Sequence, residues 1–224
     1  MKIFTIVILA VLSPTVFADE INFSGPYAGL GIGYSSTKDH HNEFSQYDGS
    51  FDGFSGKKNS QSMSGSIFAG YNFRRNNIVF GPEISFTKLN SSNESVQDYF
   101  GTEDADFGTK VKVNWNLSLK ARLGYVYNEN SLFYITGGFV DSDVDRNYYT
   151  YNLAQDHFNH KDKGILVGLG IERKVSDNIN LRLNYDHISY ENETNVPTNS
   201  WSGLNDVHTG IKSNNANLAI IYQF

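Results

Sequence analysis

Residues 110–127 alternate between apolar and polar side chains, and this two-residue period constrains the fold more than any other feature. Its odd positions are all apolar: Val111, Val113, Trp115, Leu117, Leu119, Ala121, Leu123, Tyr125 and Tyr127. Its even positions are mostly polar. Side chains on a β-strand alternate between two faces, whereas a helix would mix the two sets. The segment is therefore predicted to be a strand with one apolar and one polar face.

Seven further segments have the same period, which gives eight predicted strands: 26–36, 63–73, 78–87, 110–127, 132–140, 164–175, 179–189 and 215–224. Segment 132–140 is apolar on both faces, so its orientation stays open. Three connections are short, at 74–77, 128–131 and 176–178. Four are long and polar, at 37–62, 88–109, 141–163 and 190–213.

Long and short connections alternate strictly along the chain. Outer-membrane barrels have this rule, because their short turns face the periplasm and their long loops face outside. We therefore predict an all-β, eight-stranded antiparallel up-and-down transmembrane β-barrel with four long outer loops and three short periplasmic turns. A water-soluble barrel with an inward apolar face is the alternative, but it does not predict alternating connection lengths.

The first eighteen residues have the pattern of a secretory signal peptide. Lys2 is followed by an apolar run at 3–12, and Val16 and Ala18 provide small residues before a cleavage point. The run is about half the length that a transmembrane helix needs. We predict a signal peptide at 1–18 and a barrel domain at 19–224.

Composition narrows the class of protein further. The chain has no cysteine, which excludes disulfides and thiolate metal sites. Its net charge of −6 argues against nucleic acid as a partner. Aromatic side chains favour both membrane interfaces, and two girdles are expected. The periplasmic girdle would contain Tyr27, Tyr71, Phe73, Tyr125, Tyr127, Tyr222 and Phe224, and the outer one Tyr34, Phe86, Trp115 and Tyr185.

If the apolar face meets lipid, the polar face lines the lumen. Its charged residues are Glu83, Lys110, Lys112, Lys120, Arg122, Glu172, Lys174, Arg182 and Asp186. Unpaired buried charges are costly, so a network of ion pairs is expected across the lumen. The mid-strand members predicted to form it are Glu83, Lys120, Arg122, Glu172 and Arg182. A packed lumen is favoured over an ion or proton path, because side chains fill small barrels. Pro82 should introduce a bulge or remove a ladder bond.

Three segments of the chain read FSGPYAGLGIGYS, SLKARLGYVYNENSLFYITGGFV and GILVGLGIERKVSDNINLRLNYDHISY. They resemble the small bacterial outer-membrane proteins of the Omp25/Omp31 and OmpA-like β-barrel group. The resemblance implies the outer membrane of a Gram-negative bacterium, with an assembly signal at Tyr222 and Phe224. It also implies that the partners are outer-membrane lipids, lipopolysaccharide and the barrel assembly machinery. Structural, porin-like, adhesive and haem-binding roles all occur in the group.

No cofactor is expected, and the protein is predicted not to be an enzyme. A haem, a metal or a host ligand could bind at the outer loops, where His40, His41, His157 and His160 lie. Solvated histidines are the simpler interpretation. His187 and Ser189 have the spacing of the His-x-Ser pair of lipid A deacylases, but the residues that follow do not match that family.

Overall fold

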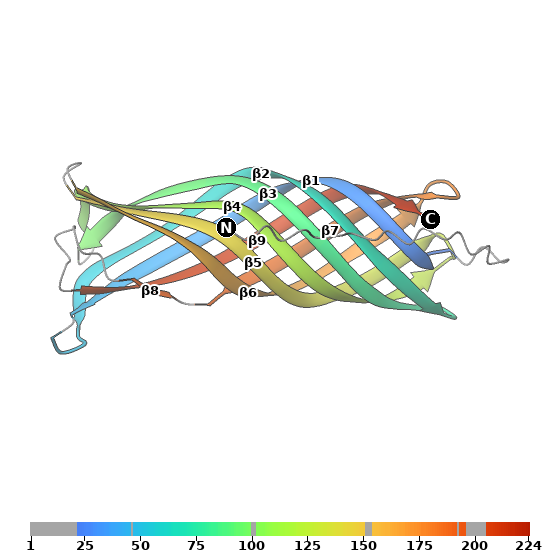
Figure 1. Ribbon diagram of the computed structural model, residues 1–224, viewed down its shortest axis with the longest axis horizontal. Coiled ribbons are helices and arrows are strands. Elements are labelled where there is room, and N and C mark those ends of the chain that lie inside the picture. The colour runs from blue at the N-terminus through green and yellow to red at the C-terminus, as the bar shows by residue number, and fades with distance from the viewer. Residues whose placement is uncertain (1–21, 46, 100–101, 151–153, 192, 196–204) are drawn as a thin grey trace, which may run out of the picture.

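Eight long antiparallel strands form a closed barrel in the computed structural model (Figure 1), which describes residues 22–224 except 46, 100–101, 151–153, 192 and 196–204. Each strand pairs with the next, and β1 pairs with β9 to close the ring. The described residues include no helix that is long and apolar enough to cross a membrane. The long strands are β1 Gly25–Ser45, β2 Phe51–Arg75, β3 Ile78–Tyr99, β4 Thr102–Tyr127, β5 Ser131–Thr150, β6 Ala154–Lys174, β7 Ile179–Tyr190 and β9 Asn205–Gln223.

The short strand β8, Glu193–Asn195, continues β7 along the edge of β9. Ser189 pairs with Lys212 and Glu193 pairs with Thr209, so four steps along one strand oppose three along the other. One extra residue is the mark of a β-bulge. The strand pairing therefore continues past β7 towards the outer end.

Most of the predicted long loops are strand, which corrects that part of the prediction. The first hairpin remains paired as far as Phe44 and Phe51, and the strands run nearly the full length of the molecule (Figure 1). A strand of about 9–11 residues crosses a bilayer, whereas β4 has 26 residues. Both faces of these extensions are largely polar, so they lack the alternation by which strands are recognised.

The part of the barrel with exposed apolar side chains forms a continuous outward band. Leu30, Ile67, Leu119 and Ile165 lie in it, and all are more than half exposed. Segment 132–140, whose orientation the sequence left open, directs Phe133 outward and buries its neighbours. The band is the surface that lipid would cover.

A bulge in β4 reverses the faces of this strand near the outer edge of the band. The register with β5 shifts between Val113 and Trp115. Val111 and Val113 are buried inside the barrel, and Lys110 and Lys112 are exposed. The expectation that these two lysines line the lumen is therefore wrong, because one additional residue moves every later side chain to the other face.

The ladder between β2 and β3 is interrupted beside Pro82. Gly70 pairs with Glu83 and Phe73 with Phe80, but no pairs form between them. The register is the same on both sides of the gap, as expected when proline removes one backbone N–H donor from the ladder. Gly81 lies at this gap, and a Cβ atom on it would be 1.8 Å from the carbonyl oxygen of Tyr71.

Gly81→Ala should destabilise the barrel by about 1–3 kcal/mol, because the methyl group has no space beside the Tyr71 carbonyl. The measurement is the temperature above which the unboiled, folded protein migrates on a denaturing gel like the boiled, unfolded protein. Gly137→Ala is the matched control, since nothing lies within 4 Å of a Cβ atom there. Equal behaviour of the two variants would contradict the role of Gly81.

Candidate functional site

The five charged residues predicted to pair in the lumen lie together there, and we call them the lumen network. Glu83 Oε1 is 2.8 Å from Lys120 Nζ, and Glu83 Oε2 is 2.6 Å from Arg182 Nη1. Glu172 Oε1 is 2.7 Å from Arg182 Nη2 and also bonds Arg122. All five side chains are buried. Asp186 lies 3.9 Å from Lys120, so three cations face three carboxylates.

Three aromatic side chains enclose the two guanidinium groups of this network. Arg182 lies 4.2 Å from the ring centroid of Phe68, and Arg122 lies 4.1 Å from that of Tyr134. Tyr27 donates a hydrogen bond of 2.8 Å to Glu83 and accepts one of 2.7 Å from Arg122. Such contacts between cations and aromatic rings strengthen when water is excluded.

Tyr27 is 2% exposed, so its placement in the periplasmic girdle is wrong. It shares the parity of Gly29 and Gly31, which marks the lumen side. Gly70 leaves the space for its ring, since a Cβ atom at Gly70 would be 2.4 Å from the Tyr27 hydroxyl. The parity of Tyr27 was therefore the signal that could have identified this lumen residue.

A cavity of about 40 Å³ lies above the lumen network on the side of the long strand extensions. Hydroxyl and amide side chains line much of it, including Ser66, Ser118, Asn184 and Asn217. A cavity needs about 10–15 Å³ to hold one water molecule. This space therefore fits a few water molecules and no larger solute.

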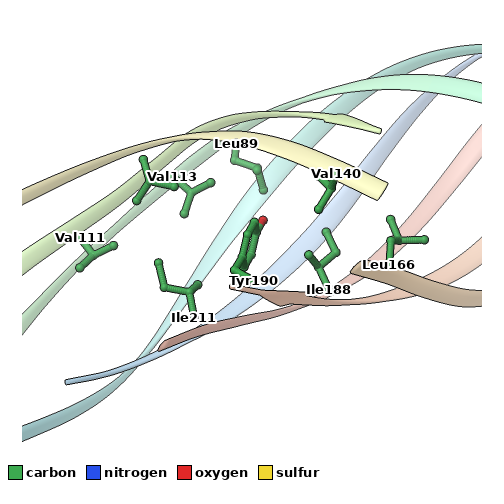
Figure 2. Packing of buried hydrophobic residues seen from close by; sticks show 9 residues of the cluster. Leu89, Val111, Val113, Val140, Leu166, Ile188, Tyr190 and Ile211 are labelled. Atoms are coloured by element: carbon green, nitrogen blue, oxygen red, sulfur yellow. The ribbon is translucent and has the colours of Figure 1, made fainter. Parts of the chain in front are cut away.

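Apolar side chains from six strands pack together inside the barrel above the cavity (Figure 2), and we call them the outer plug. They converge from the barrel wall around Tyr190. The Tyr190 hydroxyl accepts a hydrogen bond of 3.1 Å from Ser142, which fixes the position of the ring. The members are Leu89, Val111, Val113, Val140, Val144, Leu166, Ile188, Tyr190 and Ile211.

A second buried cluster lies at the periplasmic end of the lumen. Phe23 is 2% exposed and packs with Val79, Val126 and Leu132. The preceding residue, Asn22, accepts a hydrogen bond of 2.6 Å at its carbonyl from Arg74. Apolar side chains therefore lie both above and below the charged layer.

A second group of buried charges lies level with the outermost members of the outer plug, where Arg146 pairs with Val111 and Asp39 pairs with Ile211. Arg146 forms a bidentate ion pair with Asp162, and both side chains are 1% exposed. Asp39 is also buried, and its Oδ1 atom has no hydrogen-bond partner in the described part of the chain. Burial raises the pKa of Asp39 to about 6, an effect that nearby Arg146 opposes and Asp162 adds to.

The predicted ligand residues do not form a described site. His40 is exposed on the outer surface of β1. The side chains of His41, His157 and His160 lie outside the described residues. Across the described ranges, no group of three or more His, Asp or Glu side chains is arranged to hold a metal ion.

The proposed lipid A deacylase pair is also not assembled. His187 Nδ1 lies 2.8 Å from Asn214 Oδ1. No described hydrogen bond joins His187 to Ser189. The described partner of the His187 imidazole is therefore Asn214. Tyr222 and Phe224, predicted as an assembly signal, both point outward, with ring centroids 5.0 Å apart.

A family model described as the outer membrane protein beta-barrel domain matches residues 4–224. The chain belongs to this family. A 22 kDa outer membrane protein of Rhizobium leguminosarum bv. viciae is 29% identical over 140 residues, which cover 62% of this chain and 58% of that protein. The 31 kDa outer-membrane immunogenic protein of Brucella melitensis is 29% identical over 185 residues, covering 75% and 71% of the two chains. The resemblance to the Omp25/Omp31 group is thus confirmed.

The fold also matches a solved outer-membrane barrel. The outer membrane protein OprG of Pseudomonas aeruginosa superposes with a TM-score of 0.64 at 12% identity, over 92% of this chain and 98% of that one. At this identity the likeness concerns the fold alone. The protein is an outer-membrane β-barrel of a bacterium.

Arg182→Met should lower the free energy of unfolding by about 3–5 kcal/mol, because it leaves Glu83 and Glu172 buried with fewer cations. Urea unfolding in detergent micelles measures this. Arg173→Met, on the exposed face of β6, is the control and should cost less than about 1 kcal/mol. A similar loss in both variants would contradict the importance of the lumen network.

The stability of the wild-type protein should decrease as the pH rises from about 4 to about 6 and then level off. The Asp39 carboxyl binds a proton more tightly in the folded protein than in the unfolded one. Its ionisation therefore lowers the free energy of unfolding by about 3 kcal/mol at pH values above this range. Asp39→Asn should remove this decrease in a series of urea midpoints. Asp177→Asn, at the exposed periplasmic turn, is the control and should retain the decrease in stability. A decrease that persists in Asp39→Asn would disprove its assignment to Asp39.

Proposed function

We propose that the protein is a closed, non-conducting outer-membrane barrel that displays its outer segments at the cell surface. The observation that carries this is the sequence of layers along the lumen: an apolar cluster, a paired charged layer and the outer plug. Water and ions cross a barrel only where the lumen leaves them room. In the described part of the barrel, these layers fill the lumen with packed side chains on both sides of the small cavity.

The lumen network is proposed to stabilise the barrel rather than to conduct ions or protons. Each carboxylate in it is paired with two or more cations, and apolar side chains separate it from both ends of the barrel. A conducting path would need polar groups or water connecting the network to solvent. A structural role thus accounts for the pairing, and the protein is proposed not to be an enzyme.

The partners follow from the membrane setting. Outer-membrane lipid would cover the apolar band, and lipopolysaccharide would surround its outer edge. The barrel assembly machinery would recognise the outward residues Tyr222 and Phe224 at the last strand. A host or small-molecule ligand would bind at the outer segments, and the Brucella relative is called an immunogenic outer-membrane protein. Haem binding through the histidines named above is the alternative.

Proteoliposomes that contain the purified barrel should show no more solute flux than protein-free liposomes, because the outer plug fills the lumen. Swelling in a sugar solution measures the flux, and a general porin reconstituted in parallel provides the positive control. The gel migration of unboiled samples verifies that the reconstituted protein is folded. Swelling close to that of the porin would disprove the closed lumen.

A further inference from the structure

Two lysines lie directly opposite each other at the seam that closes the barrel. Lys38 on β1 pairs with Lys212 on β9, and both side chains are exposed on the outer surface. Neither forms an ion pair with any side chain that the structure describes. Like charges directly opposite on neighbouring strands destabilise a sheet. An anion between the two ammonium groups would therefore stabilise this seam.

The height of the lysines corresponds to the headgroups of the outer leaflet. Along the outward face of β1, Tyr34 is the last residue of the apolar band, and Lys38 lies two outward positions beyond it. With the usual rise and tilt of barrel strands, that separation is about 10 Å along the membrane normal. Lysine side chains are long enough to bend back towards the lipid surface.

Polar groups adjoin the pair on its membrane side. Asn214 lies next to Lys212 on the outward face of β9. Its Oδ1 atom is 2.8 Å from both the Tyr185 hydroxyl and His187 Nδ1. On β7, the exposed Ser189 pairs with Lys212. Hydroxyl, imidazole and amide groups thus lie beside the two cations, where they could form hydrogen bonds with a phosphorylated sugar held by the lysines.

The opposite wall has a different charge pattern. On β6, Lys161 and Lys163 lie opposite Asp143 and Asp141 of β5. These lysines face carboxylates, whereas at this height the described outward side chains of β9, β1 and β2 include no carboxylate. The seam is thus the basic side of the barrel, although the chain as a whole carries a net charge of −6.

We propose that Lys38 and Lys212, assisted by His187 and Ser189, bind a phosphate group of lipopolysaccharide in the outer leaflet. We call this group of four side chains the lysine seam. The proposal rests on the placement in the membrane given under the proposed function. Lysine is a common phosphate ligand that acts as a point charge. One phosphate between the two strands would remove their repulsion and fix a lipid at the closing edge of the barrel.

The test is the binding of purified lipopolysaccharide to the full mature barrel in detergent micelles at low ionic strength. Lys38→Gln with Lys212→Gln should weaken binding about 30-fold. Lys161→Gln with Lys163→Gln is the matched control, because it removes the same charge from the same height and should change binding by less than about threefold. Lys38→Arg with Lys212→Arg should retain most of the affinity.

Further measurements separate the possible outcomes. Lipopolysaccharide whose phosphates have been removed should bind wild type as weakly as the double glutamine variant binds the intact lipid. Equal losses in the two double variants, or no loss in either, would overturn the proposal. Displacement of the lipid by millimolar inorganic phosphate would also overturn it, in favour of a free-phosphate site. The gel shift and the liposome assay on the same samples test the fold and the closed lumen independently.

Discussion

Arg182 joins carboxylates from two walls of the barrel. It lies on β7, whereas Glu83 lies on β3, four strands away in a ring of eight long strands, so their 2.6 Å contact crosses the lumen. Glu172, on the neighbouring strand β6, binds the same guanidinium group. In lipid, apolar side chains on the outer face gain little by packing together. Contacts across the lumen must therefore provide much of the specific stabilisation.

The residues around this contact are adapted to it. Phe68 and Tyr134 cover the guanidinium groups of Arg182 and Arg122, and Gly70 leaves space for Tyr27 to reach Glu83. The strands that direct these groups inward also direct Ile, Leu and Phe side chains outward, because successive side chains on a strand point to opposite faces. One alternation thus produces both the lipid-facing band and the lumen network.

The part of the chain inside the membrane could be predicted from its sequence, because lipid on one side and a polar lumen on the other impose the alternation on every strand. The composition of the lumen network followed from parity and from the cost of unpaired buried charge. Beyond the membrane the outer face meets water instead of lipid and the inner face is partly polar, so the alternation weakens and the sequence predicts loops there. The bulge between Val113 and Trp115 escaped prediction because the apolar residues keep their parity while the backbone reverses the faces. Tyr27 was misplaced because its aromatic character was given more weight than its parity.

The strand extensions set the distance between the outer turns and the membrane. From Tyr34 to Ser45, β1 continues in paired strand geometry, which corresponds to about 30 Å along the membrane normal at usual rise and tilt. A paired sheet holds this height, unlike a flexible loop, which would fold back onto the lipid. Large proteins such as antibodies would then meet the turn residues first, and sugars attached to neighbouring lipids would shield the walls. Sequence changes would consequently be tolerated most easily at the turn between β1 and β2, where they alter the exposed tip without affecting the paired strands below.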